Sequence, residues 1–66
     1  MNIIVNGENR EIPDNSTAAD LIATLDMTNA RIAMEVNMEI IPRSQHADFR
    51  LHEGDKIEIV RAIGGG

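Results

Sequence analysis

The chain has 66 residues, no cysteine and a formal net charge of −5, with 42% hydrophobic and 2% aromatic residues. This length allows one small domain and excludes a multidomain enzyme. The absence of cysteine excludes disulfides, thiolate metal sites and thiol chemistry. Because Phe49 is the only aromatic residue, the core has to be aliphatic.

Charge and hydropathy also restrict the partners and the location. An acidic chain without a basic stripe or a set of aromatic residues lacks the groups that grip phosphates and stack on bases. We therefore expect no nucleic-acid binding. No apolar run reaches the ~20 residues of a membrane helix, and no leader opens the sequence. We expect a cytoplasmic protein without membrane association.

The first predicted elements form a β-hairpin. Residues 3–5 are β-branched, and Asn6-Gly7, a strong turn signal, follows them directly. Alternation places Ile4 on the outer face of this strand and its two neighbours toward the core. The return strand, near residues 10–12, is polar enough to lie at the edge of a sheet.

A short helix follows the hairpin. Ser16 or Thr17 can serve as its N-cap, and Thr17 with Asp20 three residues later resembles a capping box. Four apolar residues at helical spacing form one stripe, which has to pack on a sheet because the helix is short. These are Ala18, Leu21, Ile22 and Leu25. We expect the helix to end in residues 26–29, with Asn29 as a candidate left-handed residue.

Two strands and an irregular segment are predicted next. Residues 32–36 alternate between apolar and polar side chains, which is typical of a half-buried strand. A turn at Met38-Glu39 leads to a short strand at Ile40-Ile41. Residues 43–50 are polar and irregular.

The same alternation predicts a last strand at residues 56–61. Ile57 and Ile59 should face the core, while Glu58 and Val60 face outward. One helix packed on one face of a sheet is an α+β, two-layer fold.

The spacing of polar and charged residues along the sequence shows almost no sign of a conventional catalytic or metal site. His46 and His52 lie in a polar stretch without a third ligand at a standard spacing, so we interpret both as surface histidines. No pair of carboxylates is marked out for acid–base chemistry. We expect no catalytic residue, no metal and no bound cofactor in this chain.

The C-terminal sequence Gly64-Gly65-Gly66 remains as the candidate for chemistry. Three residues without side chains can thread a narrow channel, and a free α-carboxylate is ionised at neutral pH. This carboxylate could attack the α-phosphate of ATP in the site of another protein. The alternative is a frayed tail without function.

Several segments of the chain together form a recognisable signature. One is the terminal Gly-Gly directly after a last strand. The others are residues 1–7, residues 17–22, the V-N-x-x-[IV]-[IV]-P-R pattern at 36–43 and the G-D-x-[IV]-x-[IV] pattern within 53–60. On these segments the chain resembles the ThiS family of ubiquitin-like, β-grasp sulfur carriers of thiamine biosynthesis. Residues 27–31 match no signature of the family.

The resemblance implies a fold and a chemistry. The fold would be a mixed β-grasp sheet at residues 1–63, with its first and last strands parallel at the centre, followed by a flexible tail at 64–66. A ThiF-like, E1-type adenylyltransferase would adenylate Gly66 with ATP. Persulfide sulfur from a cysteine desulfurase would convert it to a thiocarboxylate, which thiazole synthase (ThiG) would use. The chain would be a carrier rather than an enzyme, and a monomer when free.

Two other functions use the same tail. The small subunit of molybdopterin synthase shares the fold and the activation chemistry, although it is usually longer and richer in aromatic residues. A ubiquitin-like protein modifier would use the carboxylate to acylate a lysine. For any of these, we expect partners to dock on the outer face of the sheet, with Ile4, Val60 and Ile63 as candidate contact residues.

Overall fold

The structure is a computed structural model that describes residues 1–61. Its elements in chain order are β1 (Asn2–Val5), β2 (Glu8–Glu11), α1 (Ala18–Thr24), β3 (Ile32–Val36), β4 (Glu39–Ile41), the 3-10 helix η1 (Arg43–Gln45) and β5 (Lys56–Arg61). Within residues 1–61, no helix is long and apolar enough to cross a bilayer.

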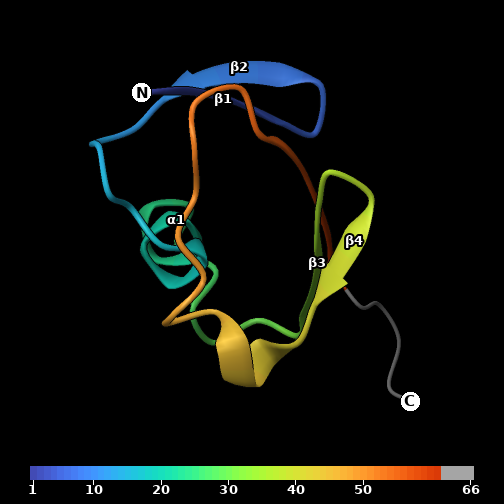
Figure 1. The fold of residues 1–66 in the computed structure, drawn as a ribbon. Helices are drawn as coiled ribbons and strands as arrows, with labels where there is room; N and C mark the ends of the chain where they lie inside the picture. Colours follow the sequence, from blue (N-terminus) through green and yellow to red (C-terminus); the bar gives the residue numbers. More distant parts are fainter. Residues whose placement is uncertain (62–66) are drawn as a thin grey trace.

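The strands form one mixed sheet in the order β2-β1-β5-β3-β4. Strands β1 and β5 are parallel, and the other neighbours are antiparallel. The first and last strands therefore meet inside the sheet, as the resemblance implied. Helix α1 lies on one side of the sheet (Figure 1), so the predicted two-layer α+β arrangement is confirmed.

The core between sheet and helix is aliphatic, as the composition requires. Every strand except β2 contributes to it, and the four residues of β2 are all exposed at the sheet edge. The five largest side chains that are almost completely shielded from solvent anchor the core: Ile3, Leu21, Met34, Leu51 and Ile57.

Helix α1 begins and ends with defined caps. The Thr17 hydroxyl accepts a hydrogen bond from the Asp20 amide at 3.1 Å, and an Asp20 carboxylate oxygen accepts from the Thr17 amide at 2.9 Å, which confirms the predicted capping box. At the other end, the Met27 amide donates to the Ile22 carbonyl at 3.0 Å. This Schellman closure places Asp26, with φ 59°, in the left-handed region. The expectation for Asn29 was wrong because the helix closes three residues earlier.

Two turns also differ from the predicted positions. Val5 pairs with Glu8 across the two-residue turn at Asn6-Gly7, so β2 starts earlier than residue 10. The turn between β3 and β4 is Asn37-Met38, both with positive φ (51° and 72°), rather than Met38-Glu39. A two-residue turn with two left-handed positions matches the twist of a hairpin, which fixes this register.

Asparagine side chains from both turns hold the central strand β5. Asn6 accepts a hydrogen bond from the Ile59 amide at 2.8 Å and donates to the Ile59 carbonyl at 3.2 Å. On the opposite flank, Asn37 accepts from the Lys56 amide at 3.0 Å. The backbone of β5 is thus fixed beyond the points where its neighbours end.

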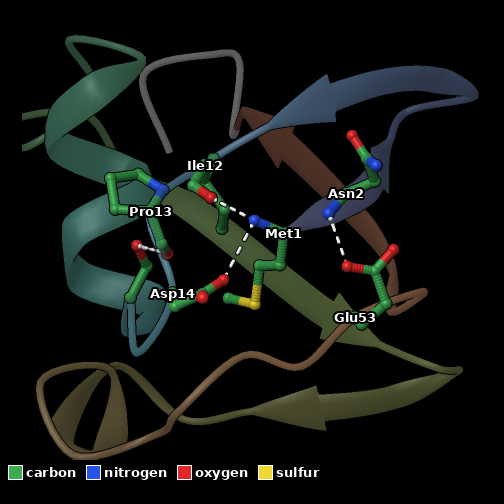
Figure 2. Close-up of polar contacts among 7 residues, drawn as sticks. Met1, Asn2, Ile12, Pro13, Asp14 and Glu53 are labelled. Atoms are coloured by element: carbon green, nitrogen blue, oxygen red, sulfur yellow. Dashed lines mark hydrogen bonds and ion pairs between the residues drawn. The ribbon is translucent and has the colours of Figure 1, made fainter.

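Polar contacts also fix the end of the sheet where β5 begins (Figure 2). The amino group of Met1 donates to the Ile12 carbonyl at 2.6 Å and contacts an Asp14 carboxylate oxygen at 3.2 Å. The Asn2 amide donates to the Glu53 carboxylate at 2.9 Å. These contacts connect the loops before α1 and before β5 to strand β1.

Candidate functional site

The candidate site begins where β5 ends. This strand lies at the centre of the sheet and finishes at Arg61, the last residue that the structure describes. The predicted tail residues Gly64, Gly65 and Gly66, and the candidate docking residue Ile63, lie outside the described residues. The predicted domain boundary after residue 63 lies there as well.

The two faces of β5 have different environments. Ile57 and Ile59 are buried under α1, whereas Glu58 and Val60 are exposed on the opposite, outer face. The alternation predicted from the sequence is confirmed. Among residues 1–61, the last side chain on the outer face is thus an exposed aliphatic one, Val60, with 61% of its surface accessible.

Sequence reasoning missed two exposed apolar residues near this face. Ile40 on β4 is 68% exposed and lies opposite Glu35, and Met38 in the β3–β4 turn is 90% exposed. Ile40 was identifiable in principle, because its neighbour Ile41 had to face the core and alternation then turns Ile40 outward. Met38 carries no such signal, because its exposure follows from the turn.

Ile4 and Val60 share the outer face but lie at opposite ends of it. Ile4 is half-buried and pairs with Lys56, whereas Val60 pairs with Ala33 on the other flank of β5. Lys56 and Val60 are four residues apart, or about 13 Å at ~3.3 Å per residue. The two side chains therefore do not form one continuous apolar patch. Their role in docking stays a prediction.

The centre of the outer face is acidic. Glu35 and Glu58 are directly opposite each other on β3 and β5. Like charges in this position oppose strand pairing. Within residues 1–61 neither carboxylate takes part in an ion pair. This face therefore combines an acidic centre with the exposed aliphatic side chains of Ile40 and Val60.

The two histidines differ from each other. His46 is 6% exposed, and its Nε2 lies 2.9 Å from the Ile41 carbonyl oxygen. The interpretation of His46 as a surface residue was wrong, because the turn after η1 folds back and buries the ring. A carbonyl only accepts, so Nε2 donates and the ring has a structural role. His52 is exposed, as predicted. In the part of the chain that the structure describes, no three potential ligands gather as a metal site.

Comparison with known proteins gives a consistent result over the whole chain. The ThiS family profile matches residues 3–66. The sulfur carrier protein ThiS of Escherichia coli (strain K12) is 32% identical, and the match covers 100% of both chains. A thiazole synthase of Paramagnetospirillum magneticum (strain ATCC 700264 / AMB-1) is 39% identical over all of this chain, which spans only 20% of the length of that relative.

The structural comparison agrees. A crystal structure of the thiamine biosynthesis protein ThiS from Geobacter metallireducens superposes with a TM-score of 0.85 at 26% identity, covering 100% of both chains. The fold is thus the ubiquitin-like β-grasp that the sequence resemblance implied. A protein of this kind is a substrate for other enzymes rather than a catalyst. The chain therefore belongs to the ThiS family, the sulfur carrier proteins of thiamine biosynthesis.

Proposed function

We propose that this carrier acts through the carboxylate of Gly66. In an adenylyltransferase of the ThiF type, a carboxylate oxygen attacks the α-phosphate of ATP, and pyrophosphate leaves. The terminal sulfur of a persulfide, supplied by a cysteine desulfurase, then attacks the acyl carbon and AMP leaves. A thiol reduces the resulting acyl disulfide to the thiocarboxylate. ATP is bound by the activating enzyme and not by the carrier.

The observation that supports this proposal most directly is the extent of the family match. It runs to residue 66 and so includes the glycine tail as well as the described body. Gly66 is the fifth residue after Arg61, and a fully extended segment of five residues spans at most ~18 Å. A body fixed at β5 could therefore stay outside a partner while the carboxylate reaches a buried site.

The proposed acceptor of the sulfur is thiazole synthase. A relative with that name contains a segment 39% identical to this entire chain, within a protein about five times as long. A carrier-like segment in the same polypeptide as a thiazole synthase is expected if the carrier and the synthase have to bind each other for sulfur transfer. We place the docking surface for the adenylyltransferase on the outer face of the sheet, around Val60 and Ile40, with Ile63 and Ile4 as the other candidates.

Intact-protein mass spectrometry tests the proposal. The chain is incubated with ATP, the ThiF-type enzyme of the same organism, and a cysteine desulfurase with cysteine. Replacement of one oxygen by sulfur, localised to the C-terminal peptide, is the expected result. The control is deletion of Gly66, which moves the carboxylate by up to ~3.5 Å and should abolish sulfur transfer, because a 1 Å misplacement already costs about a hundredfold in rate.

Three outcomes contradict the proposal. The first is a C-terminal peptide that never gains sulfur, and the second is equal sulfur transfer to the deletion variant. The third is an amide bond between Gly66 and lysines of other proteins, which would make the chain a modifier. Thermal unfolding of the deletion variant should match the wild type, so that a lost fold does not explain a lost reaction.

A further inference from the structure

The arginines of this acidic chain are unevenly distributed. Arg31 and Arg61 line one shallow hollow together with Asp26 and the loop between α1 and β3. The pairing of Ile32 with Arg61 brings these two arginines together at the end of β5. Three residues of the loop, Thr28, Asn29 and Ala30, complete the lining.

A second hollow adjoins the first. The two share Thr28 and Ala30 in their linings, and the second also contains Arg43 from η1. In Figure 1, η1 and the loop between α1 and β3 lie at the same end of the molecule. We call Arg31, Arg43 and Arg61 the basic end.

The charge balance of the basic end is the reverse of that of the whole chain. The chain has 6 basic and 11 acidic residues. The two hollows contain three of the basic residues and a single acidic one, Asp26. Within residues 1–61, the only ion pair joins the Met1 amino group to Asp14, so no carboxylate of this segment pairs with these guanidinium groups.

We propose that the basic end binds carboxylates on the surface of the adenylyltransferase, at the mouth of the channel that receives the tail. The inference rests on the proposed function of Gly66. Guanidinium groups present several donors in a planar fork that matches carboxylates, and they are always charged. Arg61 is the last described residue of β5, Arg31 lines the same hollow and Arg43 lines the adjoining one, so the three together orient the carrier with its tail toward an acidic rim.

Carboxylates of a protein fit this position better than the phosphates of ATP. The nucleotide reacts with Gly66, five residues beyond Arg61. A chain that reaches into a channel in extended form therefore holds the phosphates up to ~18 Å from the Arg61 backbone. An arginine side chain spans less than half of that distance. The arginines consequently meet the rim of the channel rather than its interior.

Charge reversal with steady-state kinetics tests the proposal. The variants are Arg31→Glu, Arg61→Glu and the double variant, and the control is Arg10→Glu on the exposed edge strand β2, which makes the same change in net charge. We expect each single variant to raise the KM for the carrier about five- to tenfold, and the double variant more, with kcat unchanged. Arg10→Glu should change KM less than twofold. Added salt should raise the KM of the wild type and affect the double variant less.

A double variant with the KM of the Arg10→Glu control would overturn the proposal. Reduced kcat at saturating carrier with an unchanged KM would overturn it too, because the arginines would then act on the nucleotide. Binding of the carrier to the adenylyltransferase without ATP separates the two hypotheses. Arginine-dependent binding without any sulfur transfer would contradict the proposed function of Gly66 and support the basic end as a docking site.

Discussion

The two ends of β5 use their charged residues differently. Where the strand begins, carboxylates are engaged in holding the fold: Asp14 contacts the Met1 amino group, Glu53 accepts from the Asn2 amide, and Asp55 accepts from the His52 amide at 2.8 Å. Where the strand ends, Arg31 and Arg61 line a hollow without an ion pair among residues 1–61.

This difference indicates that the two ends of a strand of only six residues have different roles, one in stabilising the fold and the other in contacting a partner. The hydrogen bonds at the first end of β5, where the strand begins, hold the neighbouring loops in one conformation and so stabilise the folded state. Exposed charged groups without an ion-pair partner among residues 1–61 gain little stability from that segment. Their use has to be sought in a partner, and they stand next to the segment that carries the chemistry.

The largest effect on stability should come from the first end. Ile57 is 0% exposed and faces Val5 across the parallel strand pair. Ile57→Ala removes buried methylene and methyl groups and leaves a cavity, so the free energy of unfolding should fall by about 2–5 kcal/mol. Chemical denaturation measures this loss. Val60→Ala, near the other end, is the control and should change the free energy of unfolding by less than about 0.5 kcal/mol. Equal losses of unfolding free energy in the two variants would contradict the inference that the first end of β5 contributes more to stability than the second.

The junction between β1 and β5 should give the next largest effect. Asn6→Ala removes both hydrogen bonds to Ile59 and places alanine at φ 50°. We expect a loss of about 1–3 kcal/mol in the free energy of unfolding. Asn6→Gly tolerates the positive φ, so the difference between the two variants isolates the backbone cost. Both should keep the KM for adenylation, and a raised KM in a variant that remains folded would connect this junction to docking.

On the outer face, Val60→Glu should act on binding more than on stability. The side chain is 61% exposed, and a carboxylate there removes an apolar contact and adds to the charge of Glu58. We expect the KM for the carrier to rise about tenfold with an unchanged melting temperature. Ile4→Glu, at another candidate docking residue, should raise the KM as well, and it should also lower the melting temperature because Ile4 is half-buried. A Val60→Glu variant with wild-type kinetics would remove this residue from the docking surface.

Local patterns predicted the elements of the fold, and long-range contacts account for what they missed. Alternation placed Ile57 and Val60 correctly on opposite faces, and the capping box restricted the start of α1 to Ser16 or Thr17, of which Thr17 is the N-cap. Both signals involve only neighbouring residues. Burial of His46 depends on a turn that folds back toward Ile41, and local polarity cannot indicate this.

The site was predictable in part for the same reason. Val60 follows from alternation, but its distance from Ile4 depends on the register of two strands that are about fifty residues apart in the sequence. The basic end was not identified, because Arg31, Arg43 and Arg61 are scattered along the chain. Only the pairing of β3 with β5 and the position of η1 bring them together.

The smallest effect should come from Asp14→Asn. The carboxylate is 83% exposed and lies 3.2 Å from the Met1 amino group, which keeps its shorter bond of 2.6 Å to the Ile12 carbonyl. An exposed ion pair contributes little because solvent and salt screen it, so the melting temperature should fall only slightly. The KM for adenylation should stay within about twofold of the wild type, because a charge farther than the Debye length of about 8 Å from the contact is screened.

Arg61→Gln changes the net charge by the same amount in the opposite direction and should raise the KM. If Asp14→Asn altered the KM as much as Arg61→Gln does, the total charge of the carrier would govern docking, and the two ends of β5 would not differ in function.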